Sequence, residues 1–441
     1  MSHPKARRGS AARAPAGRRD AARPQRGSLT LLIACMACVA ASVLIIPLPS
    51  IATDVASNAA VKPVDVREIR VLIGDQVHQV RFRSAQGLRL TDEKGRRLDP
   101  IAPHSWVTIE RAGTGRVRLN GSEHAAVQWH VVAPAKTCEV AWFGERDWLD
   151  PLTYPGTFRI LIGSESGFDV INELDLERYV SCVTAWEAWP TFHVEALRAQ
   201  AVVARSFALF QMVRRHESPW DIAATQGAQV YRGLRADDVG RRAAQAAAHT
   251  SGIVCAWSEG DEDRLFSTYY SAACGGMSQS AAIFGAADGV PPLAGEVACD
   301  FCRIAPRETY RWGPVRMSAR DALARIAARY SDARSLGRLD SVDVIERARH
   351  GRAVRIRLMG GGQSFEMLAE QFRLALGGSV VRSTWSDIRV VGDELVFEKG
   401  KGFGHGLGLC QWGMEGQAIA GRRAGEILRH YYPGSNLVRV Y

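Results

Sequence analysis

The chain has 441 residues, enough for two or three domains, and its hydrophobic content of 46% is typical of packed, ordered cores, which excludes a largely disordered protein. The net charge is +10, but residues 1–26 carry Lys5 and seven arginines against Asp20 alone, so +7 lies in this tail and +3 in the rest. Because the tail has no interleaved aromatic residues, the charge does not indicate a protein that binds nucleic acid.

An apolar segment follows the basic cytoplasmic tail that we assign to residues 1–27. Residues 28–48 are uncharged and mostly apolar. About 20 such residues span a bilayer, and the flanking positive charge keeps the N-terminus inside. We therefore predict a single-pass anchor in the cytoplasmic membrane, with the rest of the chain in the periplasm or exterior. A signal peptide cleaved near Ala52 is the alternative.

The next part of the chain shows the pattern of β-strands. Apolar and polar residues alternate through residues 65–170, in short runs separated by Gly, Asn and Asp. This pattern predicts strands and turns, and we assign residues 65–150 to a small β-rich domain. It contains no cluster of titratable residues, so we interpret it as a scaffold or a substrate-positioning module.

Two helical patterns follow, separated by a corner at Pro190. In the first, Leu176, Val180 and Val183 recur at four- and three-residue spacing, which is the apolar stripe of a helix that faces a core. Glu187 is the next position on that stripe, and the proline ends the helix close to it. The second helix, roughly residues 194–213, is rich in alanine, so another backbone can approach it closely.

Glu187 is the candidate catalytic residue. Trp186 and Trp189 flank it, so we expect a partly dry cleft, where burial raises the pKa of a carboxyl group. Such a group suits a general acid near neutral pH. The alternative is a buried structural carboxylate. Glu195, in the first turn of the second helix, is a weaker candidate because the helix dipole already explains a carboxylate there.

Other residues are candidates for substrate contacts. Arg198 and Arg205 lie seven residues apart on one helix face, and they would either hold an anionic substrate or pair with acids. Near the C-terminus, glycines at 402, 404, 406 and 408 form a loop that opens a helix near Gln411. It matches no phosphate-binding motif. We expect its backbone to lie against a flat ligand, with His405 and Gln411 as polar groups; a tight structural turn is the alternative.

Three cysteines stand close in sequence. Cys274 is followed by two glycines, and Cys299 and Cys302 form a CxxC pair. They would form a disulfide with one thiol left over, or supply three ligands to a structural zinc ion with a histidine as the fourth. A nucleophilic Cys274 is a further alternative, although no partner histidine can be identified from spacing.

The remaining patterns complete an α+β fold. We predict a helix over residues 237–250, a strand in LFSTYYSAACGG, an amphipathic helix over residues 317–330, and strands through residues 340–398 with a short helix near 369–376. Helices packed on antiparallel strands, with the glycine loop returning to the Glu187 cleft, would form a binding groove.

Four motifs in one order resemble the stage II sporulation protein D (SpoIID) family. They are LERYV, WEAWP and EALRAQAVVARSFAL around Glu187, then TQGAQVYRG, YYSAACGG and GFGHGLGLCQWGMEGQAIAG with EILRHYYPGS. The resemblance runs from about residue 154 to the C-terminus, so we assign residues 154–441 to a SpoIID-like domain. Three positions depart from the family pattern: Ala188 replaces the usual Met after the Glu, Tyr270 replaces a His, and Cys274 replaces the Ser that follows it.

The resemblance implies an exterior lytic transglycosylase that cleaves peptidoglycan glycan strands stripped of stem peptides. It makes Glu187 the single acid/base, and no cofactor is required for this chemistry. Its motifs add four substrate-binding candidates to Arg205, His405 and Gln411: Gln229, Tyr231, Tyr270 and Ser271. Since the family also includes amidase enhancers, the alternative is a non-catalytic wall-binding protein that recruits or stimulates an N-acetylmuramoyl-L-alanine amidase.

Overall fold

The computed structural model describes residues 68–144, 147–163, 167–284 and 290–441. The predicted basic tail and the predicted membrane helix over residues 28–48 lie outside these ranges. Within them, no helix is both long enough and apolar enough to cross a membrane. The described residues form helices and mostly antiparallel sheets, so the α+β prediction is confirmed at the level of fold class.

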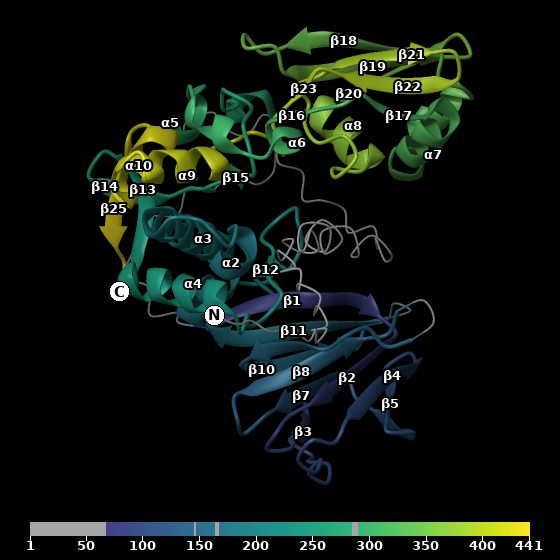
Figure 1. Ribbon diagram of the computed structural model, residues 1–441. Coiled ribbons are helices and arrows are strands. Elements are labelled where there is room, and N and C mark those ends of the chain that lie inside the picture. Colours follow the sequence, from purple (N-terminus) through teal and green to yellow (C-terminus); the bar gives the residue numbers. More distant parts are fainter. Residues whose placement is uncertain (1–67, 145–146, 164–166, 285–289) are drawn as a thin grey trace, which may run out of the picture. The chain divides into compact units, whose positions relative to one another are not determined.

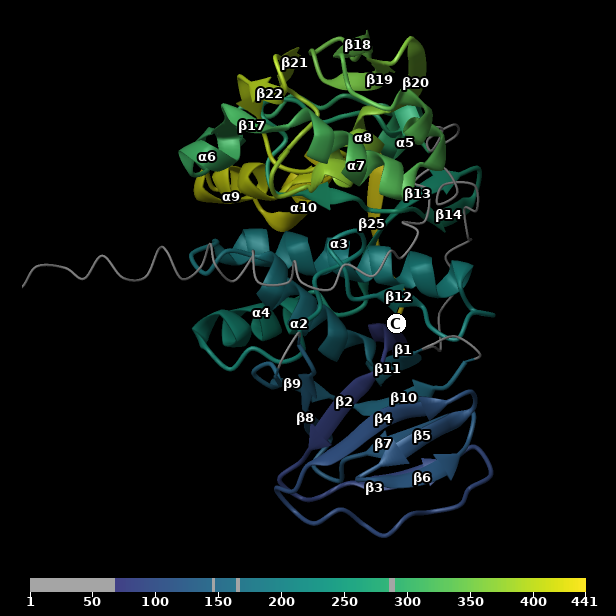
Figure 2. The ribbon, with the colours of Figure 1, turned by 90° about the vertical axis from the view of Figure 1, so that its right-hand side faces the viewer.

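Two six-stranded sheets make up the first part of the described chain, with strand orders β12-β1-β11-β10-β7-β3 and β6-β5-β4-β2-β8-β9. The strands of both sheets lie together in the two ribbon views (Figures 1 and 2). Their bounds are β1 (Glu68–Val77), β2 (Gln79–Arg83), β3 (Arg89–Asp92), β4 (Val107–Gly113), β5 (Arg116–Leu119), β6 (Ser122–Ala125), β7 (Gln128–Val132), β8 (Thr137–Trp142), β9 (Leu152–Pro155), β10 (Thr157–Leu161), β11 (Phe168–Asp175) and β12 (Ile222–Ala223).

The alternating sequence pattern explains these sheets. In β2, Val80 and Phe82 are buried while the alternate residues are only half-buried, as the period of two in a strand requires. The predicted domain boundary at residue 150 falls between β8 and β9, which pair with each other. The first sheet also takes in β10, β11 and β12 from beyond that boundary, so its strands come from both predicted domains.

Three helices pack against one another after the sheets: α2 (Leu176–Glu187), α3 (Val194–Arg214) and α4 (Asp238–His249) (Figure 1). Each begins at a side-chain cap, which the side chains of Asp175, His193 and Asp237 provide by accepting backbone N–H bonds. Helix α3 is buried around most of its circumference, and α2 and α4 both pack against it, as its small residues allow. It is therefore the central helix of this layer.

The C-terminal segment returns to the strands that follow α4. Strand β13 pairs with both β14 and β25, and the short strands β15 and β24 form a parallel pair. This region contains β13 (Ile253–Glu259), β14 (Glu262–Leu265), β15 (Tyr270–Ser271), η2 (Ala281–Phe284), α5 (Pro291–Ala294), η3 (Phe301–Ile304), β24 (Leu409–Cys410), α9 (Gln411–Ile419), α10 (Ala424–Tyr431) and β25 (Ser435–Arg439).

Residues between η3 and β24 form a lobe with a hydrophobic core of its own. Its three-stranded sheets have the orders β17-β22-β21 and β18-β19-β20. The elements are α6 (Arg307–Tyr310), β16 (Arg311–Trp312), β17 (Val315–Ser318), α7 (Ala319–Arg329), η4 (Ser331–Leu336), β18 (Ser341–Arg347), β19 (Ala353–Gly360), β20 (Gln363–Leu368), α8 (Ala369–Leu376), β21 (Asp387–Val391), β22 (Glu394–Glu398) and β23 (Gly400–Lys401).

Candidate active site

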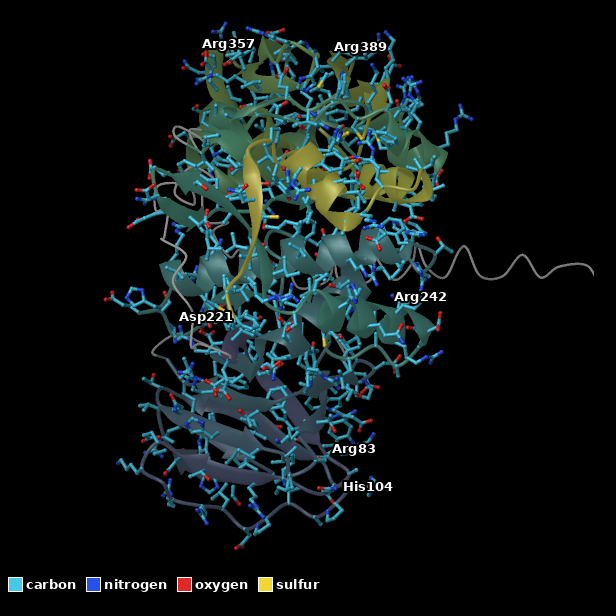
Figure 3. The ribbon with its side chains drawn as sticks, turned by 90° about the vertical axis from the view of Figure 1, so that its left-hand side faces the viewer. Arg83, His104, Asp221, Arg242, Arg357 and Arg389 are labelled. Atoms are coloured by element: carbon cyan, nitrogen blue, oxygen red, sulfur yellow. The ribbon has the colours of Figure 1, made fainter. Side chains whose placement is uncertain are left out.

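Glu187 is the last residue of α2, and the chain around it is fixed in place. Ala188 takes an extended conformation as the C-cap. Pro190 disfavours helical geometry at Trp189, so the helix cannot continue. Arg242 of α4, labelled in Figure 3, donates hydrogen bonds to the carbonyls of Pro190 (2.7 Å) and Phe192. The carboxylate therefore stands at a helix end whose following corner is held by a cation.

Three donors approach the Glu187 carboxylate. Its Oε1 accepts a hydrogen bond from the backbone N–H of Val230 at 2.8 Å and one from the hydroxyl of Tyr270 at 3.0 Å. Its Oε2 lies 3.5 Å from Nε2 of Gln411, which also donates to the main-chain carbonyl of Glu187 at 3.3 Å. Among the described residues, no cation forms an ion pair with Glu187. Oε1 is thus held by two short bonds, while Oε2 has one long contact.

The environment of Glu187 favours the protonated acid. The residue is half-buried, and removal of its carboxyl group from water raises the pKa. The hydrogen bonds from Val230, Tyr270 and Gln411 lower it again, but by less than burial raises it. A proton is therefore available on this side chain at higher pH than on an ordinary glutamate.

The pair of short strands β15 and β24 positions two of the donors. Tyr270 lies opposite Leu409 in the parallel register, and Ser271 lies opposite Cys410. Gln411 follows directly and begins α9, where its amide also donates to Oε1 of Gln200 at 3.3 Å. Two segments far apart in sequence thus meet at Glu187, and the glycine loop returns to the same place as predicted.

Aromatic rings line the chain beside Glu187. The ring of Trp189 lies 5.5 Å from that of Trp412, and Phe192 meets Trp412 edge-on at 5.2 Å. Both tryptophans are half-buried, so part of each ring faces solvent. Trp412 was missed in the sequence, although it directly follows Gln411; only the fold brings it beside Trp189.

Trp186 is anchored rather than free. Its Nε1 donates to the carbonyl of Gly233 at 2.9 Å, and the guanidinium groups of Arg232 and Arg235 lie 5.0 and 5.2 Å from its ring centre. These contacts fix the loop that also carries Val230, whose N–H reaches the carboxylate.

Arg205, a predicted substrate contact, belongs to the interior instead. Its side chain is 0% exposed and binds both carboxylate oxygens of Glu177, at 2.6 and 2.7 Å. Its remaining hydrogen bonds go to the carbonyls of Ala247 and Ile253. The prediction is wrong because the apolar helix α3 turns this face inward, where a cation needs a carboxylate partner.

Gln229 and Tyr231 are also too deeply buried to touch a substrate. Gln229 accepts from the hydroxyl of Tyr179 at 2.9 Å and donates to a carbonyl of α3. The hydroxyl of Tyr231 donates to Asn172 at 2.6 Å. Their exposed fractions are 0% and 2%. These side chains therefore hold the loop around Val230 against the helices, and they are structural, contrary to prediction.

His405 lies on the glycine loop and is half-buried. Its Nδ1 accepts from the backbone N–H of Leu407 at 2.9 Å, and it also hydrogen-bonds the backbone of Tyr270. Burial lowers its pKa to about 4, so its imidazole is neutral. Ser271 is buried, with a hydroxyl oxygen that has no hydrogen-bond partner among the described residues. These two residues support Tyr270 from its own strand and from the loop.

The glycine loop packs against protein, not against an open face. A Cβ at Gly402 would lie 2.6 Å from the carbonyl of Ala273, and one at Gly408 would lie 2.1 Å from the carbonyl of Tyr269. Both glycines have positive φ, as do the two between them. The expectation that this backbone lies against a flat ligand is therefore replaced by its alternative, a tight structural turn.

Glu195 and Arg198, the weaker candidates on α3, pair with each other. Glu195 also accepts the backbone N–H of Ala424 at 2.9 Å, at the start of α10. These contacts explain both residues structurally.

Four cysteines, not three, come together. The Sγ atoms of Cys274, Cys299, Cys302 and Cys410 all lie within 4.8 Å of one another, and all four side chains are buried. The predicted histidine ligand is replaced by Cys410, which the glycine loop delivers. The described cysteines are free rather than disulfide-bonded. Cys274 is 1% exposed and none of its described hydrogen bonds reaches a histidine, so the geometry does not support a nucleophilic thiol.

Comparison with known proteins identifies relatives of this chain. The family model for SpoIID, a stage II sporulation protein, matches residues 164–257. An uncharacterized protein of Brachyspira hyodysenteriae is 31% identical over 271 residues, which cover 61% of this chain and 68% of that protein. The chain belongs to the SpoIID family. The matched SpoIID segment includes α2, α3 and the loop that carries Val230.

A second relative carries a functional name. The amidase enhancer of Bacillus subtilis is 36% identical over 67 residues, which cover 15% of this chain and 9% of that protein. The likeness to the amidase enhancer is therefore confined to a short segment.

Proposed function

We propose that this chain is a peptidoglycan lytic transglycosylase that cleaves glycan strands, stripped of their stem peptides, after N-acetylmuramic acid. One observation carries the proposal: Glu187 is a half-buried carboxyl group with a raised pKa, hydrogen-bond donors on one oxygen and no ion-pair partner among the described residues. Such a group can donate a proton near neutral pH. Membership of the SpoIID family supports a role at the cell wall.

The proposed reaction uses the carboxyl group twice. Oε2 of Glu187 gives its proton to the glycosidic oxygen, and the bond from C1 of N-acetylmuramic acid to that oxygen breaks, leaving a hydroxyl on the departing sugar. The Glu187 carboxylate then takes the proton of the C6 hydroxyl, and the oxygen of that hydroxyl bonds to C1 of the same sugar. The product has a 1,6-anhydro end, Glu187 is protonated again, and no water is consumed.

The surrounding contacts suit this cycle. Val230 and Tyr270 hold Oε1, so Oε2 is the oxygen that carries the mobile proton. The same two donors stabilise the carboxylate that forms after the transfer. Because the nucleophile belongs to the substrate, one carboxyl group is enough, whereas ordinary glycosidases need two. The intramolecular hydroxyl also supplies part of the rate through its high effective concentration.

Aromatic side chains would bind the sugars. The exposed parts of Trp189 and Trp412 offer apolar faces beside the acid, on which the C–H face of a sugar ring can stack. Gln411 and His405 would complete the polar contacts. The substrate lies outside the cytoplasmic membrane, which fits the predicted anchor at residues 28–48.

A second function is supported by the likeness to the amidase enhancer. In that case the chain would bind wall polymer and stimulate an N-acetylmuramoyl-L-alanine amidase without cutting glycan itself. The uncompensated carboxyl group favours the enzyme, because a binding surface gains nothing from a half-buried acid.

Mass spectrometry of products tests the proposal. Purified full-length protein is incubated with denuded glycan strands, beside the variants Glu187→Gln and Glu217→Gln; the second makes the same chemical change at a side chain that is 90% exposed. We expect 1,6-anhydro fragments from the wild type and Glu217→Gln only. Intact strands from every sample, with the protein still sedimenting with cell wall, would instead favour the amidase-stimulating function.

A further inference from the structure

The cysteine cluster, formed by Cys274, Cys299, Cys302 and Cys410, has the dimensions of a tetrahedral metal site. The Sγ atoms of Cys274 and Cys302 are 3.7 Å apart. With Zn–S distances of about 2.3 Å, sulfur ligands at the corners of a tetrahedron are about 3.8 Å apart. A disulfide would need about 2.05 Å. The spacing therefore fits several ligands around one ion better than a bond between two of them.

Backbone N–H groups point at one of these sulfur atoms. Cys410 Sγ accepts hydrogen bonds from the N–H of Cys274 at 3.2 Å and of Gly413 at 3.3 Å. Cys410 is also the N-cap of α9, where the helix dipole stabilises a thiolate. A Cβ at Gly413 would lie 2.5 Å from Cys299 Sγ, so only glycine fits beside the cluster. These contacts favour sulfur atoms that carry negative charge.

Arg352 is a buried cation next to the cysteine cluster. It is 0% exposed, and its Nη2 donates to the carbonyl of Cys274 at 2.6 Å. Within the described residues, no carboxylate forms an ion pair with it, and its Nε and Nη1 have no hydrogen-bond partner. A buried charge without a counter-charge is strongly destabilising. Glu370 carries a negative charge that acts on Arg352 without forming an ion pair. Four thiolates around one divalent cation leave two further negative charges, which would offset the charge of Arg352 directly.

We propose that Cys274, Cys299, Cys302 and Cys410 bind one zinc ion, and that the guanidinium of Arg352 offsets the negative charge of the thiolate ligands. Four soft sulfur ligands in a closed, buried site are the chemistry of structural zinc. This inference stands on the cluster itself and does not depend on the activity proposed for Glu187.

The ion would hold together the segments that reach Glu187. Cys410 ends β24 and directly precedes Gln411, and Cys274 follows β15, which begins with Tyr270. A metal that joins these two cysteines therefore closes the parallel strand pair at its end. The Tyr270 hydroxyl and the Gln411 amide would keep their places at the carboxylate only while the ion is bound.

Metal analysis of the purified full-length protein is the first test. We expect one zinc per chain in the wild type and in Cys255→Ser, a buried cysteine outside the cluster, and loss of zinc in Cys302→Ser. Wild-type protein without metal, or with a disulfide between two cluster cysteines, would overturn the proposal. Iron in place of zinc would overturn the identity of the ion.

Variants of Arg352 test the counter-charge. Outer contacts of metal ligands commonly contribute 10- to 100-fold to affinity, so Arg352→Met should bind zinc about 10- to 100-fold more weakly in a chelator competition. Arg352→Lys should recover part of this loss because it keeps the charge. Cobalt reconstitution gives a second measurement, since its absorption spectrum reports four-sulfur tetrahedral coordination. Equal affinities of all three proteins would refute the role of Arg352.

Hydrogen exchange tests the link to the acid. Removal of zinc by a chelator should speed amide exchange in residues 270–272 and 409–412, with little change in the distant strand β4. Unchanged exchange in these segments after verified metal loss would refute the claim that zinc holds them in place. Whether the four cysteines bind zinc is decided separately by the metal analysis.

Discussion

The two ends of α2 carry carboxylates in opposite electrostatic environments. Burial raises the pKa of both. At Glu177 this effect is outweighed by the hydrogen bonds and charge of Arg205 together with the hydroxyl of Tyr441, so its pKa is lowered overall. At Glu187 only neutral donors are present, and the pKa stays raised.

One helix thus carries a structural carboxylate near its start and a titratable one at its end. Both carboxylates lie on one twelve-residue helix. A cation makes the first a fixed anion that ties α2 to α3. Glu187 has no such cation among the described residues. It can therefore gain and lose a proton, which is the property a general acid needs.

Replacing Glu187 should lower the activity far more than replacing Glu177. Glu187→Gln should lower kcat on denuded glycan by about 10²–10⁴-fold, the usual contribution of a general acid. Glu177→Gln should leave kcat per folded molecule near the wild-type value. In the wild type, kcat should fall as pH rises through the raised pKa of Glu187. Equal losses of kcat in both variants would show that the two carboxylates do not differ in their roles.

The cation of the first site should matter for stability. Arg205→Met leaves the half-buried Glu177 carboxylate without its counter-charge, which should cost up to about 3–5 kcal/mol of unfolding free energy in urea titrations. Arg241→Met, which breaks an exposed pair with Asp238, is the matched control and should change little. A small loss at Arg205 would mean that Glu177 is satisfied without it.

Loss of the hydrogen bond from Tyr270 to Glu187 should lower kcat by a smaller factor. Tyr270→Phe removes a hydrogen bond from Oε1 that lowers the pKa of Glu187. A neutral hydrogen bond contributes about 0.5–1.5 kcal/mol, so kcat should fall by up to about tenfold. The alkaline limit of the pH–rate profile should move to higher pH. A shift to lower pH would show that Tyr270 stabilises the protonated acid.

The smallest expected effect is on the stability of the Glu187 site. A carboxyl group whose pKa is higher in the folded than in the unfolded state lowers the free energy of unfolding at pH values above the folded pKa. This loss of stability disappears below the unfolded pKa of about 4.3. Glu187→Gln should therefore unfold at a higher temperature than wild type near pH 7. The difference should vanish on acidification below pH of about 4. A less stable variant at pH 7 would contradict the raised pKa.

Much of the local structure follows from short-range patterns. The stripe through Leu176, Val180 and Val183 predicted α2, and Pro190 predicted its end close to Glu187. The helices now seen as α3, α7 and α8 begin and end within a few residues of the expected positions. Period and caps act within one or two turns, so a sequence displays them directly.

The contacts that define the site are not local. Cys410 reaches the other cysteines only because β24 pairs with β15. From its position on α3, Arg205 was predicted to contact substrate. Its carboxylate partner Glu177 lies on another helix, so spacing along α3 did not reveal the pair. Spacing along one element cannot reveal which face meets which neighbour, so the buried roles of Gln229 and Tyr231 were equally hidden.

The glycine loop has a consequence for genetic screens. Gly404 lies against Ser271 and Gly406 against the guanidinium of Arg352, where a Cβ would come within 2.7 Å of each. Alanine at either position should impair the protein as severely as a change at Glu187. A mutational scan would thus show these two glycines as intolerant, and a reader of that scan would infer substrate contacts at positions that in fact pack against Ser271 and Arg352.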